Sequence, residues 1–457
     1  MKNRSLSQIE GIIQAKTVAI VGASGSPGKV GRMFLDRYIE AGFENIIPVN
    51  PKESEILGLK AYPSVVDIPR PVDLVHVLLP PKAVVEVVED CIKKRVKGII
   101  VTSAGFGLGS DSASLEKQLI KRATTKGIRI VGPNCIGIYR PGTNLPFPLG
   151  QPMITGGIGI VSQSGSFADL LTKIATANGI YFSKVISCGN ESDLNAVDFL
   201  EYLGNDPETR IIVAYLEGIE DGRKFHELVK KISISKPIIA WKCGNTPAGA
   251  KAAASHTGSL AGSGEVWDGV LASGGAIPVN SLEEALDCIY LLSTQPAPRG
   301  NRVAIVTGPG GPAVGVTDTL VEMGMETALF SSETIEKIQN LIPPFGTSAE
   351  NPVDLSIAAI EMPEMYGDVI ETLDQDDTVD MILAIGLGGD PFCQTIEHVS
   401  KKIHKPLAVT IIYPPEEVAR DTKRLLSARI PVYPDARRAA IALAKYWTYE
   451  RYKKDAV

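Results

Sequence analysis

Short apolar runs recur along the chain and alternate with longer amphipathic stretches. Three of these runs, at residues 18–22, 158–162 and 303–308, share one design, in which β-branched residues are followed directly by Gly, Ser or Thr. Such a run predicts a buried strand whose carboxyl end turns into a helix, as at the start of a parallel, doubly wound domain. The repetition therefore predicts three consecutive α/β domains.

Further apolar runs follow each opening at the spacing of βα units, and segments such as 81–95 and 115–126 have the periodicity of crossover helices. The further predicted strands are 46–49, 72–79, 98–101 and 128–131, then 184–187, 211–216 and 237–241, then 381–385 and 407–412. Proline and glycine concentrate at 141–152 and 295–300, which indicates two linkers. The predicted domains are 1–140, 153–294 and 301–457.

Composition narrows the class of protein. The 457 residues carry a formal net charge of −6 without a basic run, so nucleic acid is not an expected partner. No apolar run reaches the ~20 residues needed to span a bilayer, and the polar start is unlike a signal peptide, so a cytoplasmic location is expected. None of the six cysteines forms a CxxC pair, so neither zinc nor disulfides are indicated, and no metal site is expected.

The turn after the first predicted strand, residues 22–31, is rich in Gly and Ser. Glycine lets backbone approach a ligand closely, and the N–H groups at the start of the following helix favour an anion. The pattern is neither a clean GxGxxG nor a Walker A sequence. Where an NAD-binding domain usually has an acid after its second strand, this chain has Lys52, which suits a phosphorylated ribose. A tight turn without a ligand is the alternative.

The equivalent turn of the second domain, residues 162–167, reads Ser-Gln-Ser-Gly-Ser-Phe. Its hydroxyl and N–H groups converge at a predicted helix start, which makes it a candidate phosphate site. From these residues alone, a turn that binds nothing fits equally well. A hydrolase nucleophile at Ser162 or Ser164 fits poorly, because the spacing is not GxSxG.

Two polar residues follow predicted strands of the second domain. Glu217 comes directly after the apolar run 211–216, in the usual place for a site residue, where a carboxylate can orient an imidazole. A solvated loop acid is the alternative, because further acidic residues follow at once. Asn190 comes after the run 184–187 and is a candidate contact for a small carboxylate or acyl group.

His256 lies in a stretch, residues 244–262, made almost entirely of Gly, Ala, Ser and Thr. No large apolar residue is close enough in sequence to bury the imidazole, so His256 suits a nucleophile, an acid–base group or a metal ligand on a loop. No Cys, Asp, Glu or second His stands at ligand spacing, which argues against a metal. A surface histidine is the alternative.

Together these motifs make the chain resemble the α subunit of ADP-forming acetyl-CoA synthetases, a family of the succinyl-CoA synthetase-like group. The resemblance covers essentially the whole chain. Its matching segments are 22–24, 49–52, 103–106, 132–137, 162–165, 189–191, 217–218, 255–258 and 308–312. One departure is Gly308, where Asn is expected before the Gly pair, and this leaves a ligand role for the third domain open.

The resemblance implies a Rossmann-like CoA-binding domain followed by two flavodoxin-like ligase domains. It makes His256 the phosphorylated nucleophile and Glu217 its catalytic partner. The residues that it places at CoA are Gly22, Ala23, Ser24, Ser26, Pro27, Lys29, Val49, Asn50, Lys52, Ser103, Ala104, Gly105, Phe106, Cys135 and Ile136. Those that it places at phosphate are Ser162, Gln163, Ser164, Gly165, Thr257 and Gly258. Those that it places at the acyl group are Asn134, Gly189 and Asn190.

The implied reaction is acetyl-CoA + ADP + phosphate ⇌ acetate + ATP + CoA, through an acyl phosphate and a phosphohistidine. CoA is then a substrate. No Walker A sequence and no ATP-grasp segment is recognisable, whereas a kinase-like half-reaction needs a metal–nucleotide site. The resemblance therefore implies a separate ATP-grasp β subunit that binds ADP or ATP with Mg²⁺, in an α₂β₂ heterotetramer.

Two other functions compete with this one. A non-catalytic, CoA-binding regulatory protein would have no need for His256, Glu217 and the turn at 164–165 together. An NAD(P)-dependent oxidoreductase is disfavoured by Lys52, which stands where a ribose-binding acid is usual. The sequence does not say whether acetyl, branched-chain or aryl acyl-CoA is preferred.

Overall fold

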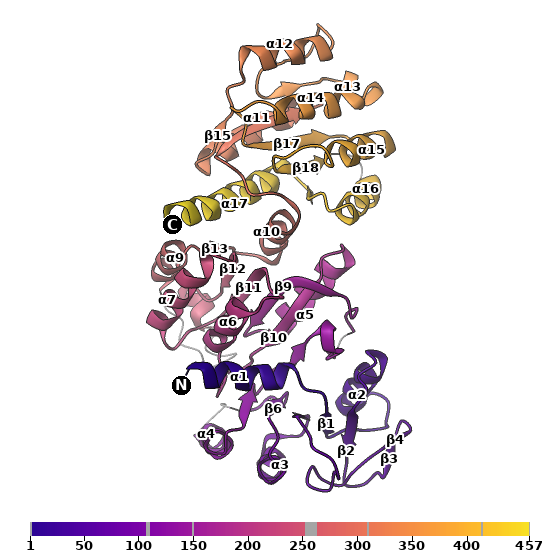
Figure 1. The fold of residues 1–457 in the computed structure, drawn as a ribbon, viewed down its shortest axis with the longest axis vertical. Helices are drawn as coiled ribbons and strands as arrows, with labels where there is room; N and C mark the ends of the chain where they lie inside the picture. The colour runs from indigo at the N-terminus through magenta and orange to yellow at the C-terminus, as the bar shows by residue number, and fades with distance from the viewer. Residues whose placement is uncertain are drawn as a thin grey trace. The chain divides into compact units, whose positions relative to one another are not determined.

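The computed structural model describes residues 2–106, 110–148, 150–251, 263–308, 310–412 and 415–456. Within these ranges the chain forms three large sheets (Figure 1). Their strands are parallel, apart from one short edge strand. Contacts divide the chain into two compact units, Met1–Asn280 and Ser281–Val457. The first unit holds two of the sheets and the second unit holds the third. The predicted class, consecutive α/β domains built on parallel sheets, is confirmed.

The first sheet is buried on both faces, which explains why its strands are continuous apolar runs. Its strands in spatial order are β2 (Ile46–Val49), β1 (Val18–Val21), β5 (Leu74–Val77), β6 (Gly98–Val101) and β7 (Arg129–Val131). The strand order reverses between β1 and β5, and ligands bind at such a switch point in open α/β sheets. Its helices are α1 (Lys2–Ile13), α2 (Val30–Glu40), α3 (Pro81–Lys94) and α4 (Ser110–Thr125).

The second sheet also belongs to the first unit. Its strands in spatial order are β13 (Ile277–Pro278), β12 (Ile238–Lys242), β11 (Ile211–Leu216), β9 (Thr155–Ser162), β10 (Phe182–Ser187) and β8 (Ile138–Tyr139). Its helices are α5 (Gly165–Ala177), α6 (Ala196–Asn205), α7 (Gly222–Ser233) and α9 (Gly264–Ser273). The strand β8 is antiparallel to β10, so the chain joins the second sheet shortly before the predicted linker at 141–152.

One apolar core runs through both sheets of the first unit. It includes Ile9 and Ile12 of α1, Leu74 of the first sheet, and Leu200 and Leu203 of α6. The helix α1 contacts both β6 and α6, and therefore links the two sheets. This shared core explains why contacts join the first two predicted domains into one unit.

The second unit contains the third sheet, in which β16 (Val353–Asp354) pairs with β14 beside the main order. The strands of that main order are β15 (Glu326–Thr327), β14 (Arg302–Thr307), β17 (Met381–Gly386), β18 (Leu407–Ile411) and β19 (Val432–Tyr433). Its helices are α10 (Leu282–Thr294), α11 (Gly310–Glu322), α12 (Ser332–Leu341), α13 (Ala358–Glu361), α14 (Glu364–Asp374), α15 (Asp390–Val399), α16 (Pro415–Ser427) and α17 (Ala436–Ala456).

The helix α10 lies in the predicted second domain by sequence but belongs to the second unit by contacts. It packs against α17, and Arg438 of α17 forms two hydrogen bonds, 2.7 and 2.8 Å long, to the carboxylate of Asp287. The structural division therefore falls between Asn280 and Ser281, whereas the predicted domain boundaries stay predictions.

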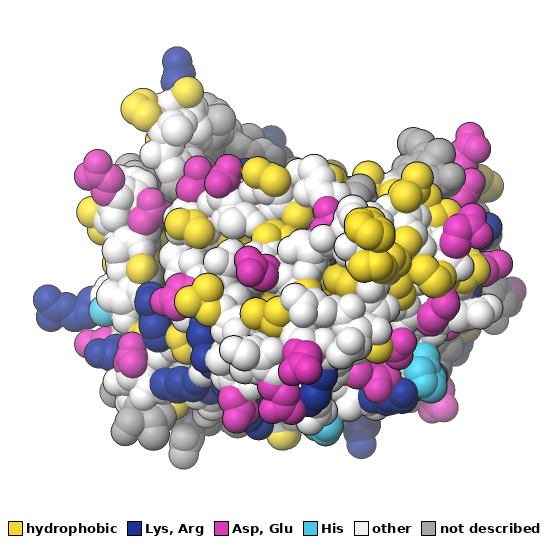
Figure 2. Space-filling view, turned by 90° about the horizontal axis from the view of Figure 1, so that it is seen from above, with side chains coloured by type: hydrophobic (Ala, Val, Ile, Leu, Met, Phe, Trp, Pro, Cys, Tyr) yellow, Lys and Arg dark blue, Asp and Glu magenta, His cyan; other side chains and the backbone are white. Residues whose placement is uncertain are grey.

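The second unit exposes several large apolar side chains. Leu329, Phe345 and Ile357 are each at least 80% exposed, and Ile360 is 54% exposed. Figure 2 shows apolar side chains lying next to one another on one area of the surface. Clustered exposed apolar side chains are typical of surfaces that contact another protein. Within the described ranges, no helix is long and apolar enough to cross a membrane.

We expect a buried histidine to make the first unit sensitive to acid. His76 of β5 is buried, with its Nε2 2.7 Å from Oγ1 of Thr102, and burial lowers its pKa to about 3. An unfolded histidine has a pKa of about 6.5 and binds the proton more readily, so stability should fall as pH drops below about 6.5. The buried histidine should contribute a slope of up to about 1.4 kcal/mol of unfolding free energy per pH unit. The variant His76→Gln should lack this contribution, as measured by urea unfolding between pH 7.5 and 5.5. His226→Gln, at a half-buried helix position, is the control. Equal slopes in wild type and His76→Gln would contradict the prediction.

Candidate active site

The carboxyl edge of the first sheet brings together the predicted residues of the first two turns. The side-chain amide of Asn50 after β2 donates to the carbonyl oxygen of Ala23 after β1, over 2.9 Å. The backbone N–H of Lys52 donates to Oδ1 of Asn50 at 2.8 Å, which places the exposed Lys52 beside the same turn. Gly22 has φ of 91°, and an added Cβ would lie 2.9 Å from Leu79. Backbone at this turn therefore approaches the neighbouring strand end closely.

The residues 24–29 of this turn present polar groups at the start of α2. Ser24 Oγ accepts from the N–H of Ser26 at 3.2 Å, and Pro27 and Lys29 are exposed. Lys29 is the N-cap of α2, and its side chain makes no capping hydrogen bond. The first N–H groups of a helix have no intrahelical acceptor, so this end of α2 suits an anion.

The edge continues along β5, β6 and β7. Ser103 after β6 donates its hydroxyl to the carbonyl of Leu79, and Asn134 donates its N–H to the carbonyl of Ser103 at 3.1 Å. Ala104 and Gly105 are exposed here. The side chains of three other predicted CoA residues are buried and support the edge from the core. These are Val49, Phe106 and Cys135.

Asn134 and Asn190, predicted from separate domains, lie together where the two sheet edges meet. The N–H of Asn190 donates to the carbonyl of Pro133 at 2.9 Å, and Nδ2 of Asn134 donates to Oδ1 of Asn190 at 3.3 Å. Ile136 donates its N–H to the hydroxyl of Ser187 at the end of β10, over 3.3 Å. Gly189 has φ of 60°, and a Cβ there would lie 2.1 Å from the Pro133 oxygen. Only glycine fits this junction without a backbone shift.

At the second sheet, the turn between β9 and α5 is organised by serine hydroxyls. Ser162 is buried, and its hydroxyl donates to the carbonyl of Ser164 at 2.6 Å and accepts the N–H of Ser164 at 3.1 Å. Ser164 caps α5 by accepting the N–H of Phe167 at 3.3 Å. Gly165 and Ser166 follow in the first turn of α5, where N–H groups have no intrahelical acceptor. This helix start therefore suits a phosphate group.

Gln163 and Glu217 lie side by side, but the structure gives Gln163 internal partners. Oε1 of Gln163 accepts the N–H groups of Glu217 and Gly218, and Nε2 donates to the Gly218 carbonyl at 2.8 Å. Nε2 also donates to Glu191 at 2.7 Å. Glu217 is 4% exposed, so its carboxylate lies within the edge and is not a solvated loop acid.

Two charged residues at this edge were not predicted. Glu191 accepts the N–H of Ala196 as well as Gln163, each at 2.7 Å, and burial raises its pKa to about 7. Lys242 ends β12, is 3% exposed, and its ammonium lies 5.2 Å from the ring centre of Trp267. Burial lowers the pKa of Lys242. The sequence signals were weak: Lys242 ends an apolar run, and Glu191 lies in the matching segment 189–191 without a role of its own.

His256, Thr257 and Gly258 lie outside the described residues. The chain leads into that segment from the carboxyl end of β12, which pairs with β11 at Leu216 and Lys242. Cys243 continues the pairing by donating its N–H to the Leu216 carbonyl at 2.8 Å. The described chain therefore leaves β12 at the same edge of the sheet that carries Glu217.

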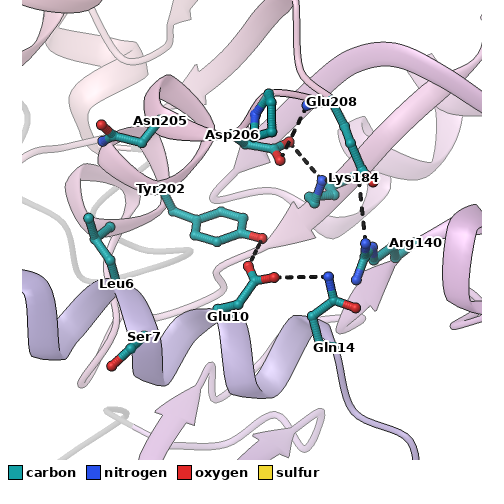
Figure 3. Close-up of a pocket in the computed structure, with 11 residues that line it drawn as sticks. Leu6, Ser7, Glu10, Gln14, Arg140, Lys184, Tyr202, Asn205, Asp206 and Glu208 are labelled. Atoms are coloured by element: carbon teal, nitrogen blue, oxygen red, sulfur yellow. Dashed lines mark hydrogen bonds and ion pairs between the residues drawn. The ribbon is translucent and has the colours of Figure 1, made fainter.

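A separate cavity of about 430 Å³ opens among α1, β10 and α6. Figure 3 shows the hydroxyl of Tyr202 directed toward Glu10, and the nitrogen of Lys184 directed toward Asp206. Tyr202 donates to Glu10, and the buried Lys184 binds Asp206 at 2.7 Å and Glu208 at 2.6 Å. These groups bind each other, and none of the residues lining the cavity is a predicted site residue. The cavity is thus a polar contact between α1 and the second sheet.

Comparison with known proteins assigns the two regions that form the edge. The family model described as a CoA binding domain matches residues 16–141. The model described as a succinyl-CoA ligase like flavodoxin domain matches residues 155–292.

Relatives of known name extend this match over the whole chain. The "Acetate--CoA ligase [ADP-forming] II subunit alpha" of Pyrococcus furiosus is 36% identical over 440 residues, which cover 94% of this chain and 95% of the relative. The chain belongs to the family of ADP-forming acetate–CoA ligase α subunits. The "Acetate--CoA ligase [ADP-forming] I" of Archaeoglobus fulgidus is 37% identical over 98% of this chain and 65% of its own length.

A solved structure gives the same result for the fold. The Ca. Korarchaeum cryptofilum dinucleotide forming acetyl-coenzyme A synthetase 1, in complex with phosphate and ADP, superposes with a TM-score of 0.88. It is 33% identical, and the match covers 96% of each chain. As an α subunit of this family, the chain is part of a ligase, which favours the catalytic interpretation over a regulatory CoA-binding protein.

We expect Gly189→Ala to disrupt the junction of the two edges in this ligase subunit. The added Cβ would collide with the Pro133 carbonyl, and backbone must move to relieve the contact. Gly179→Ala is the matched control, because Gly179 also has positive φ, of 79°, but nothing lies within 4 Å of its added Cβ. Gly189→Ala should cost about 1–3 kcal/mol more than the control in unfolding free energy, measured by urea denaturation. Equal losses in the two variants would contradict the close contact.

Proposed function

We propose that this α subunit catalyses the CoA and phosphoryl steps of acetyl-CoA + ADP + phosphate ⇌ acetate + ATP + CoA. The observation that carries the proposal is the near full-length similarity to ADP-forming acetate–CoA ligase α subunits. The site supports it, because groups suited to CoA and groups suited to phosphate lie along one continuous edge within the first unit.

CoA would bind along the carboxyl edge of the first sheet. Its phosphates would lie at the turn 24–29, where the uncapped start of α2 favours anions. Lys52 would pair with the phosphorylated ribose, since it is exposed beside that turn. The thioester would then reach the junction of Asn134 and Asn190, whose amides suit an acyl oxygen.

The phosphate would bind at the start of α5. Its oxygen attacks the thioester carbonyl, an acetyl phosphate forms, and the bond to sulfur breaks to release the CoA thiolate. N–H groups of the first turn of α5 and the hydroxyl of Ser164 can stabilise the charge that develops on the phosphate oxygens. The Korarchaeum relative was solved in complex with phosphate, which supports this part of the proposal.

His256 would then take the phosphoryl group. A neutral imidazole attacks phosphorus, acetate leaves, and the phosphohistidine passes the group to ADP. Glu217 would hold one ring nitrogen of His256 and so orient the other toward phosphorus. These roles are supported by the buried position of Glu217 and by β12, which ends at the same edge before the chain continues toward His256.

The nucleotide steps would need a partner. We infer an ATP-grasp β subunit that binds ADP with Mg²⁺, in an α₂β₂ assembly. The word "alpha" in the names of the Pyrococcus furiosus relatives supports a second subunit, and the ADP in the Korarchaeum complex supports the nucleotide. The exposed apolar side chains of the second unit also favour contact with another protein.

Lys52 tests the CoA site. Lys52→Ala should weaken CoA binding about tenfold, because one charge-assisted contact to a phosphate is lost. Calorimetric titration of the full chain with CoA measures the change. Lys126→Ala, an exposed lysine at the opposite, amino edge of the same sheet, is the control. Unchanged CoA affinity in Lys52→Ala, or binding of NADH in place of CoA, would contradict the proposed site.

His256 tests the phosphoryl chemistry. His256→Ala should abolish labelling of the chain by ³²P-phosphate and acetyl-CoA while CoA binding persists, because the nucleophile and the CoA turn belong to different predicted domains. Glu217→Gln should slow labelling by about 10²–10³-fold, as for other preorganised charge contacts. Mass spectrometry after alkaline digestion locates the phosphoryl group, since phosphohistidine is acid-labile. His226→Ala is the control; phosphate on another residue, or labelling of His256→Ala, would refute the mechanism.

A further inference from the structure

Gln163 occupies the gap between the ends of β9 and β11, where it is 6% exposed. Its backbone N–H donates to the carbonyl of Tyr215 at 3.1 Å. Both hydrogens of its amide have acceptors, the Gly218 carbonyl at 2.8 Å and Glu191 at 2.7 Å. Its amide oxygen accepts from Glu217 and Gly218. Every N–H of Gln163 therefore already has an acceptor within the protein.

These hydrogen bonds fix the backbone of Glu217 and Gly218. The amide of Gln163 holds both the N–H and the carbonyl of Gly218, and also the N–H of Glu217. Two neighbouring residues are thus fixed by a single side chain, just beyond the last residue of β11. In the proposed mechanism the carboxylate of Glu217 must point at the imidazole of His256. A small misplacement of such a group lowers the reaction rate strongly.

Glu191 determines which way the Gln163 amide points. Both oxygens of Glu191 accept hydrogen bonds, one from the N–H of Ala196 and one from Gln163, so the nitrogen end of the amide faces Glu191. The oxygen end then faces the N–H groups of Glu217 and Gly218, as observed. The reverse orientation would set the amide nitrogen against two N–H donors and the amide oxygen against an acceptor oxygen of Glu191. Glu191 is itself held by the N–H of Ala196 at 2.7 Å.

We propose that Gln163 is a positioning residue that places Glu217, and that Glu191 fixes the direction of its amide. This assignment replaces direct phosphate binding by Gln163 and rests on the proposed role of Glu217. Phosphate would be held by the start of α5, whose N–H groups and Ser164 hydroxyl lie next along the chain.

Single substitutions should lower the rate at saturating phosphate. Gln163→Glu sets a carboxylate against Glu191 and removes the donor to Gly218. Glu191→Gln must leave a donor facing a donor, either at Gln163 or at Ala196. We expect the maximal rate of ³²P labelling by acetyl-CoA and inorganic phosphate to fall about ten- to hundredfold in each variant. The half-saturating concentrations of phosphate and acetyl-CoA should change less than about threefold, since neither ligand loses a contact.

The double variant Gln163→Glu with Glu191→Gln is the decisive experiment. It exchanges the two groups, keeps the total charge, and restores an amide donor facing a carboxylate. The new carboxylate at 163 still accepts from Glu217 and Gly218, and the new amide at 191 still accepts from Ala196. Labelling should recover to at least about threefold above Gln163→Glu alone, and recovery stays incomplete because one oxygen of the new carboxylate faces the Gly218 carbonyl oxygen. If Gln163 bound phosphate directly, the double variant would stay as slow as Gln163→Glu and would need more phosphate. That result would overturn the proposal.

Two controls separate the possible failures. Gln151→Glu places a carboxylate beside Asp169, because Nε2 of Gln151 donates to Asp169 at 2.5 Å, and this pair takes no part in the hydrogen bonds of the Gln163 side chain. Its labelling rate should match wild type, and a loss equal to that of Gln163→Glu would count against a specific role for Gln163. His256→Ala is run alongside. If it is still labelled, the proposed function itself has failed; if it is unlabelled and the double variant shows no recovery, only the positioning role has failed.

Discussion

Two sheet edges meet at a peptide that has no room for a side chain. The carbonyl of Pro133 accepts the N–H of Asn190, and the neighbouring Gly189 lies so close that a Cβ would collide with the same oxygen. Because of this contact, the end of β7 and the end of β10 form one surface within the first unit. A substrate with its nucleotide part on one sheet and its thioester at the other needs such continuity. The contact therefore positions the proposed CoA and phosphate sites relative to each other.

Buried polar groups fix the conformation of the second sheet edge. Ser162, Gln163 and Glu217 are each at most 6% exposed, and a buried polar group without a partner is costly. The hydrogen bonds of Ser162 and Gln163 leave few alternative arrangements of this edge, because each donor faces one acceptor. Rigidity here comes from directional hydrogen bonds, whereas the core beneath is held by apolar packing. The edge can therefore be specific in shape while remaining polar enough to bind anions.

The sequence predicted the larger features of the fold because buried parallel strands leave a strong signal. The runs 46–49, 98–101 and 211–216 coincide with β2, β6 and β11. It missed β8, which has two residues and is too short to show a period. It could not show that α10 packs on α17, since a helix between two domains carries no mark of which one it joins.

At the site, the sequence predicted which residues lie at the edge but not which residues they hydrogen-bond. Turn composition identified Ser164 and Asn190 correctly as edge residues, because glycine and serine after a strand predict such turns. Gln163 was assigned to phosphate from its neighbours, although its contacts lie 28 and 55 positions away in the chain. Glu191 was passed over for the same reason, since nothing local shows that its carboxylate meets Gln163. Long-range hydrogen bonds of this kind are visible only once the strands are assembled.

The start of α5 has a consequence for how strongly it would hold a phosphate group, if the proposed site is used. The groups there are N–H dipoles and the hydroxyls of Ser164 and Ser166, which carry no formal charge. An anion bound by dipoles alone forms no ion pair, so its departure leaves no stranded cation behind. Such a site would orient the charged group during transfer without binding it tightly. The group could then pass readily to the next acceptor.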